Sequence, residues 1–272
     1  MRINNNVMAM NAHRQLKVNT SSQSKSLEKL SSGYAINRAG DDAAGLAISE
    51  KMRGQIRGLQ MASKNSQDGI SLIQTAEGAL GETHSILQRM RELAVQASND
   101  TNVVADRGAI KTELDDLISE VDRIATNTQF NTQSLLDGTF ATKTIQVGAN
   151  SGEVISLSIA NMNATALGVT TATTLVASTA SAQASITAIN TAIASVSTTR
   201  AGLGAKQNRL EHTINNLDTA AENLQASESR IRDVDMAKEM MSYTKSNILN
   251  QAATAMLAQA NQAPQGVLQL LK

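Results

Sequence analysis

The sequence predicts a mainly α-helical protein: a long rod-like antiparallel helical bundle or coiled coil, with paired terminal helices and a small β-hairpin region. Aliphatic side chains recur at every seventh position from Ile189 to Ile231, the spacing of a long helix that packs on partner helices. The chain has no Trp and only two Phe and two Tyr, so its core must be aliphatic. A single Pro, at position 264, leaves nearly the whole chain free to be helical.

The helix predicted over 189–231 is too long for a small compact domain. At ~1.5 Å per residue it would span about 60 Å, roughly twice what such a domain can bury against itself. Ile186, Ile193 and Ile214 widen the apolar stripe, which favours one broad face over a narrow two-stranded zipper. From this segment alone, a helix in an ordinary bundle remains an open alternative.

Two further apolar seams lie in the first half of the chain, over 72–97 and 110–124, in alternating steps of four and three residues. The polar break at 99–102 between them predicts an αα-hairpin, so that three helices share one core. The predicted rod core comprises Leu72, Ile86, Leu93, Leu114, Val121, Leu203, Leu210, Leu217 and Leu224.

The local signals divide the amino-terminal region into two helices. Gly33 is a candidate stop for the first helix, and residues 34–40 read as a linker. Asp41 or Asp42 can accept hydrogen bonds from the free N–H groups of a helix that begins near Ala43.

The middle of the chain changes character. Apolar and polar residues alternate over 145–147 and again over 155–159, and residues 148–152 supply turn chemistry, which together predict a β-hairpin. The Thr-, Ala- and Ser-rich stretch 164–184 is interpreted as a surface connection that leads into the long helix at about Ser181.

Both chain ends carry helical patterns that are too polar to be stable alone. Isolated helices are marginal in water, and each large buried side chain contributes only ~1.5 to 3 kcal/mol against ~1 to 2 kcal/mol of backbone entropy per ordered residue. We expect these segments to order against each other or against a neighbour; an antiparallel pair docked on its own rod is the alternative. The predicted assembly seams are Ile3, Val7, Met10, Leu27, Leu30, Val234, Met241, Ile248, Ala255, Leu268 and Leu271.

Composition argues against several functional classes. The 24 basic residues balance the 24 acidic ones, which gives no electrostatic case for nucleic acid or an anionic membrane. No run approaches the ~20 apolar residues of a membrane span, and no secretory signal is visible. The chain has no Cys, and its three His are scattered, so we expect no metal, no cofactor and no enzyme activity.

Several short motifs point to one family. They are LSSG at 30–33, IN at 36–37, DDAAGLAI at 41–48, SQDG at 66–69, QRMRELAVQA at 88–97, NRLE at 208–211, ESRIRDVD at 228–235 and AMLAQAN at 255–261. Together they resemble the two terminal regions of bacterial flagellin, over about 1–140 and 200–272. The middle is short and divergent, so no separate outer variable domain is expected.

The resemblance implies a structural subunit that polymerises into the flagellar filament for swimming motility. Residues 1–44 with 232–272 would form the inner core domain, and residues 45–231 the helical rod domain with its β-hairpin. The implied partners are other copies of the chain, a flagellar export chaperone, the type III export apparatus, the filament cap and hook-associated junction proteins. The implied location is the secreted, extracellular flagellum.

The resemblance also implies contact with an animal innate immune receptor through Arg89, Leu93 and Glu113. Two other functions are weighed against a filament subunit. A hook–filament junction protein of related architecture would cap an assembly instead of propagating it. A secreted metallopeptidase of the kind that some flagellins carry in an inserted middle domain is disfavoured by the missing zinc motif and the short middle.

Overall fold

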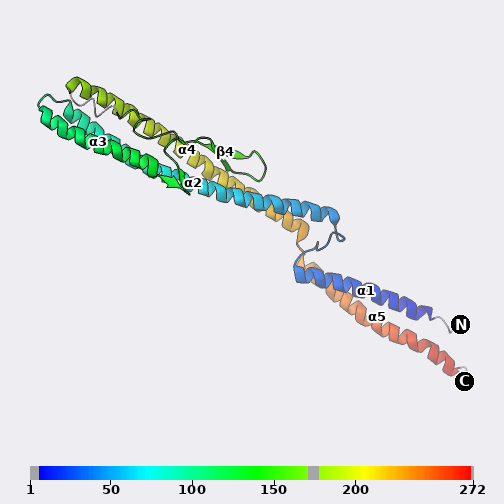
Figure 1. Ribbon diagram of the computed structural model, residues 1–272. Coiled ribbons are helices and arrows are strands. Elements are labelled where there is room, and N and C mark those ends of the chain that lie inside the picture. Colours follow the sequence, from blue (N-terminus) through cyan, green and yellow to red (C-terminus); the bar gives the residue numbers. More distant parts are fainter. Residues whose placement is uncertain (1–5, 171–177, 271–272) are drawn as a thin grey trace. The chain divides into compact units, whose positions relative to one another are not determined.

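The computed structural model describes residues 6–170 and 178–270, and this part of the chain is mainly α-helical (Figure 1). Its elements, in order, are α1 (Val7–Ser32), α2 (Ala43–Ala97), α3 (Val104–Asn127), β1 (Gln129–Phe130), β2 (Gln133–Ser134), β3 (Lys143–Gln146), β4 (Val154–Leu157), α4 (Thr179–Arg232) and α5 (Met236–Leu270). The predicted mainly α fold with long helices and a small β-hairpin is confirmed.

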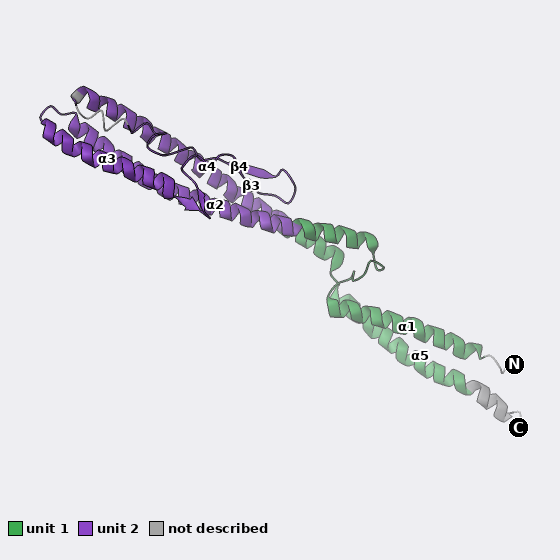
Figure 2. Cartoon of the chain, viewed as in Figure 1, with its two compact units in different colours: residues 1–55, 222–272 green, residues 56–221 purple. Residues whose placement is uncertain are grey.

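The chain forms two compact units (Figure 2). Unit 1 comprises residues 1–55 and 222–272, and unit 2 comprises residues 56–221. These units divide inside α2 and α4, whereas the division expected from the sequence lies near the helix ends, after residues 44 and 231. That expected division into an inner core domain and a rod domain remains a proposal.

Unit 2 contains the hydrophobic core, which α2, α3 and α4 enclose together with the two hairpins. The largest fully buried side chains come from α2, α3, α4, β4 and the two residues after β2: Ile73, Leu80, Leu87, Met90, Leu93, Leu114, Val121, Leu135, Leu136, Leu157, Ile189 and Leu210. On α4 the buried positions keep the seven-residue spacing of the sequence. The core is aliphatic, as the composition predicts, with Phe140 as its one buried aromatic side chain among the described residues.

The predicted β-hairpin is the antiparallel pair β3–β4, in which Ile145 lies opposite Ile155. It packs closely on α2: a Cβ added at Gly58 would lie 2.8 Å from the Cβ of Ala149, and the side-chain amide of Asn65 donates to the Gln146 carbonyl at 3.3 Å. Small residues on α2 therefore permit the close approach of the hairpin.

A second hairpin, β1–β2, has no counterpart among the sequence expectations. Its turn residues, Asn131 and Thr132, have φ angles of 50° and 63°. A turn with two residues at positive φ usually contains glycine. Because neither residue is glycine, the usual sequence signal for this turn is missing.

The interpretation of 164–184 as a surface connection is wrong for its first part. Ala164 and Val169 are fully buried, and Leu167 is nearly so. The backbone N–H of Ala164 donates to the Asp122 carboxylate on α3 at 2.8 Å, which holds the segment against that helix. Its apolar residues have no regular period, so periodicity could not reveal their burial. Residues 171–177 lie outside the described residues.

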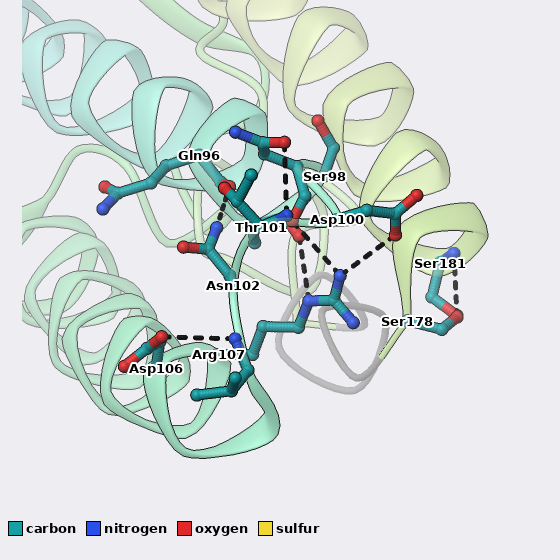
Figure 3. Close-up of polar contacts among 12 residues, drawn as sticks. Gln96, Ser98, Asp100, Thr101, Asn102, Asp106, Arg107, Ser178 and Ser181 are labelled. Carbon is teal, nitrogen blue, oxygen red and sulfur yellow. Dashed lines mark hydrogen bonds and ion pairs between the residues drawn. The ribbon is translucent and has the colours of Figure 1, made fainter.

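The turn between α2 and α3 is organised by Arg107 (Figure 3). Its guanidinium donates to the backbone carbonyls of Ala97 (3.2 Å) and Asn99 (3.3 Å), and lies 3.6 Å from the Asp100 carboxylate. The last carbonyls of a helix have no partner within the helix. Arg107 supplies one at the end of α2 and thereby fixes the predicted αα-hairpin.

The predicted end of the first helix at Gly33 and the predicted start of the next helix near Ala43 are both present in unit 1. Gly33 adopts a φ of 75°, and its N–H donates to the Lys29 carbonyl at 2.9 Å, which closes α1. At Ala43, α2 begins, and the Asp42 carboxylate accepts the N–H of Gly45 at 2.9 Å. The Asp41 carboxylate accepts the N–H groups of Arg38 and Asn37, and these bonds hold its pKa below the ordinary value.

The linkers that follow α1 and α4 pair with each other. Tyr34 and Asp233 form an isolated antiparallel bridge. The Arg232 guanidinium lies 4.9 Å from the centre of the Tyr34 ring and 2.5 Å from the Glu50 carboxylate. These contacts fasten the end of α4 to the start of α2 beside the linker.

Candidate subunit interface

Helices α1 and α5 pack along each other in unit 1. The less exposed positions of each helix recur in steps of three and four residues, which is the spacing of a coiled-coil seam. On α1 these are Ala9, Ala12, Leu16, Asn19, Gln23, Ser26 and Leu30, and on α5 they are Glu239, Tyr243, Ser246, Asn250, Ala253, Leu257 and Ala260. Most of these side chains are small or polar, so the pair buries little apolar surface.

Hydrogen bonds set the register of this pair. The Asn6 side-chain amide donates to the Ala260 carbonyl at 2.8 Å, near one end. Further along, the Asn250 amide donates to the Gln23 side chain, and the Thr20 hydroxyl donates to Asn250 Oδ1 at 3.4 Å. These contacts define an antiparallel arrangement. Polar side chains in a seam typically specify register at a cost in stability.

Leu16, Leu30 and Leu257 lie in the seam, but most of the described large apolar side chains of α1 and α5 point to solvent. The exposed ones are Val7, Met8, Met10, Val18 and Leu27 on α1, and Met236, Met240, Met241, Ile248, Leu249 and Met256 on α5. We call these residues the outer apolar face. A folded helix pair in water normally buries its large apolar residues and exposes its polar ones. The α1–α5 pair has the opposite polarity, and extended exposed apolar surface of this kind marks an interaction site.

The α5 part of the outer apolar face carries a shallow cavity of about 500 Å³. It is lined by Met240, Met241, Thr244, Lys245, Ile248 and Leu249. The Thr244 hydroxyl already donates to the Met240 carbonyl at 2.8 Å, so the lining is largely apolar or satisfied. Its chemistry suits an apolar side chain of a partner.

The predicted seam residues lie mainly on the outer apolar face or beside it. Val7, Met10, Leu27, Met241, Ile248 and Ala255 are exposed, while Leu30 and Val234 are half-buried. Ile3, Leu271 and the Leu268 side chain lie outside the described residues. The seven-residue repeat that selected Met241, Ile248 and Ala255 thus does not face α1. Polar residues that line the contact between α1 and α5, such as Asn19, Gln23 and Asn250, were missed because polar side chains carry no hydrophobic signal.

The predicted rod-core residues divide between the core and its margin. Leu93, Leu114, Val121, Leu203, Leu210 and Leu217 are buried. Leu72 and Ile86 are partly buried against the core, and Leu224, which belongs to unit 1, is half-buried.

Of the three residues singled out for receptor contact, the structure brings two together on the surface of unit 2. Arg89 on α2 donates to the Glu113 carboxylate on α3 at 2.8 and 3.0 Å and to Glu92 at 3.2 Å. Hydrogen bonds to Glu113 and then Glu92 raise the pKa of Arg89 above its ordinary value. Leu93 is only 2% exposed, so a partner that meets Arg89 and Glu113 on the surface would not reach its side chain.

The described residues hold no group of three or more His, Cys, Asp or Glu side chains that could bind a metal ion. Within the same residues, no helix is long and apolar enough to span a membrane. The candidate site rests on the exposed apolar side chains of α1 and α5, an extended surface of the kind that marks an interaction site.

Comparison with known proteins places both ends of the chain in one family. Residues 3–141 match the bacterial flagellin N-terminal helical region, and residues 186–271 match the C-terminal helical region. A flagellin from Halalkalibacterium halodurans is 63% identical over 272 residues, with all of both chains covered. The crystal structure of Bacillus cereus flagellin is 36% identical, with a TM-score of 0.50, and the match covers 61% of this chain and 94% of that one.

A more distant structure shares the fold alone. A putative flagellar hook-associated protein from Vibrio parahaemolyticus has a TM-score of 0.61 at 15% identity, with 71% of this chain and all of that chain covered. Identity this low carries no statement about shared function.

Proposed function

The chain belongs to the bacterial flagellin family and is a structural subunit of the flagellar filament, and on that premise we propose that its outer apolar face forms the contacts between subunits. The family forms an extracellular filament by self-polymerisation. A helical filament grows when one surface patch of a subunit binds a different patch of the next and the contacts do not close into a ring. Such contacts need surfaces that are exposed on the free subunit.

The reversed polarity of the α1–α5 pair supports this proposal. Side chains such as Met241 and Ile248, at 68% and 60% exposure, gain little from burial in the free subunit. Each would contribute on the order of 1 to 3 kcal/mol if a neighbouring subunit covered it. Because the intramolecular seam is small and polar, the stability of α1 and α5 in the filament would come mainly from neighbouring copies.

We further propose that residues 1–44 with 232–272 form the inner core domain and residues 45–231 the rod domain, without a separate outer domain. The close packing of α1 with α5 supports the first part. The hydrophobic core of unit 2 supports the second.

Deletion of residues 1–30 or of residues 234–272 tests the assembly role. Either truncation should abolish seeded filament growth, measured by electron microscopy and light scattering, because each removes one partner of the α1–α5 pair. Circular dichroism should show that the helices of unit 2 remain folded, since their core lies within 56–221. Normal filaments from either truncated chain would contradict the proposal.

The weak α1–α5 seam also supports the proposed route to the filament. A terminal pair that is only marginally stable alone can stay open during passage through a type III export channel, bound by an export chaperone, and then order at the filament cap. Hook-associated junction proteins would meet the same surface at the filament base. In the free subunit, amide hydrogens of α1 and α5 should exchange much faster than those of α4 in unit 2. Equal protection would argue against this route.

Recognition by an animal innate immune receptor is proposed through the paired Arg89 and Glu113. Arg89→Ala or Glu113→Ala should reduce receptor signalling by the monomeric protein. Lys111→Ala is a matched control, since it breaks an equally exposed ion pair, the 2.9 Å contact with Asp115 on α3. Signalling unchanged by the first two variants, or reduced equally by the control, would count against the proposal.

The alternative of a hook–filament junction protein is not favoured. The two flagellin regions and the full-length match to a flagellin favour a propagating subunit. The structural likeness to a hook-associated protein concerns the fold only.

A further inference from the structure

The methionines of this chain are concentrated on its outer apolar face. Met8, Met10, Met236, Met240, Met241 and Met256, on α1 and α5, are each at least half exposed. In the core of unit 2, by contrast, Met90 and Met162 are buried. Leucine would supply a similar apolar surface without a sulfur atom. Most of the solvent-exposed thioethers among the described residues therefore lie on the proposed subunit interface.

An exposed thioether reacts with peroxides. The sulfur attacks one oxygen of hydrogen peroxide, the O–O bond breaks and an S–O bond forms. The sulfur loses two electrons and the peroxide gains them. The leaving hydroxide then takes the proton from the oxygen newly bound to sulfur and becomes water. The product, methionine sulfoxide, is polar and chiral, and methionine sulfoxide reductases reverse its formation.

We propose that Met240 and Met241 form a peroxide-sensitive site that controls addition of the free subunit to the filament. Both side chains line the α5 cavity beside Ile248 and Leu249, where the free subunit leaves them open to solvent. A sulfoxide there would have to enter a largely apolar contact without adequate hydrogen-bond partners. Oxidised subunits would fail to add, while subunits already in the filament would have these sulfurs covered.

This inference rests on the proposed function, because it assigns a control to the same surface. It does not require unfolding of unit 2, whose methionines in the core are inaccessible. Met61 provides an internal comparison: it is 57% exposed on α2, in unit 2, and is not among the residues that line the α5 cavity.

The test treats purified full-length subunit with hydrogen peroxide, removes the peroxide with catalase, and maps sulfoxides by peptide mass spectrometry. Seeded polymerisation then gives the critical concentration. Oxidation should raise it about tenfold or more, and reduction by methionine sulfoxide reductases should restore it. In a parallel arm, filaments receive the same peroxide and are then dissociated. Their Met240 and Met241 should be oxidised much more slowly than in the free subunit.

Two variants separate this site from general oxidation. For Met240→Leu/Met241→Leu, the ratio of critical concentrations after and before peroxide should fall well below the wild-type ratio, because only the outer methionines Met8, Met10, Met236 and Met256 can still be oxidised on that face. Met61→Leu should keep the wild-type ratio. Met240→Gln/Met241→Gln, which places polar groups in the cavity without oxidation, should raise the critical concentration as peroxide does. Circular dichroism of each variant checks that the helices are retained.

The outcomes are distinguishable. Failure of the untreated subunit to extend seeds would contradict the proposed function, and the inference with it. If untreated subunits polymerise, an unchanged critical concentration after oxidation of Met240 and Met241 overturns the inference alone. So does a leucine double variant as sensitive as wild type, or equal oxidation rates in filament and free subunit.

Discussion

Replacing Ile248 by alanine separates the stability of the free subunit from that of the filament. The side chain lies on the outer apolar face and is 60% exposed. In the free subunit the truncation removes only the buried part of the side chain, and the higher helix propensity of alanine offsets part of that loss, so the free energy of unfolding should change by about 1 kcal/mol or less. On our proposal a neighbouring subunit covers the same side chain, so its truncation should weaken the contact between subunits and lower the stability of the filament.

The magnitude follows from the exposed share of the side chain. Isoleucine carries three more carbons than alanine, and at about 0.8 kcal/mol per buried carbon their full burial contributes about 2.4 kcal/mol. Because 60% of Ile248 is still exposed in the free subunit, roughly 1.4 kcal/mol remains to be gained on assembly. A difference of that size changes an equilibrium constant about tenfold.

The assay measures both quantities on the same protein. The critical concentration for seeded polymerisation should rise about tenfold in Ile248→Ala, while the melting temperature of the free subunit stays close to wild type. The control is Ile189→Ala, in the core of unit 2, where the side chain is fully buried. Its cavity should cost about 2 to 5 kcal/mol and lower the melting temperature of the free subunit.

Two results would refute this reasoning. An unchanged critical concentration would mean that Ile248 stays exposed in the filament. A melting temperature that falls as far as in Ile189→Ala would mean that Ile248 belongs to a core of the free subunit.

Gly58→Ala should destabilise the fold relative to Gly78→Ala, as thermal denaturation of the two variants would show. Both substitutions gain about 0.5 to 1 kcal/mol of helix propensity. Only the Cβ at position 58 would lie 2.8 Å from the Cβ of Ala149, an overlap that costs about 1 to 3 kcal/mol. Arg107→Ala should cost about 1 to 3 kcal/mol in urea unfolding, because carbonyls at the end of α2 lose their partner. Because the pKa of Asp41 is lowered in the folded protein, its ionised carboxylate stabilises the fold at pH values above the ordinary carboxyl pKa. This contribution is lost as the pH falls through the lowered pKa. In Asp41→Asn the denaturation midpoint should therefore depend less on pH over that acidic range.

Periodicity predicted the helices well where their apolar residues are buried in the core of the same chain. The repeat from Ile189 to Ile231 became α4, with Val196, Leu203 and Leu210 buried. The capping signals at Gly33 and Asp42 likewise marked the end of α1 and the start of α2. These features depend on residues close together in sequence or on a regular spacing, both of which can be read directly.

Prediction was weaker where burial depends on contacts between distant segments. The buried Ala164 and Val169 follow no regular period, and the turn at Asn131 and Thr132 lacks the glycine that usually marks its backbone conformation. In both places, packing against distant elements determines the local structure.

By itself the sequence determined that the chain is helical, where its long helices begin and end, which family it belongs to, and that the few apolar side chains of its terminal helices are too few to make these helices stable alone. Only the tertiary structure decided which way those side chains face. An apolar period shows that a face must be covered, but it does not say by what. Between α1 and α5, small and polar residues such as Asn19 and Asn250 permit close approach and hydrogen bonding, and so leave Met241 and Ile248 exposed. On our proposal, it is another copy of the chain that covers them.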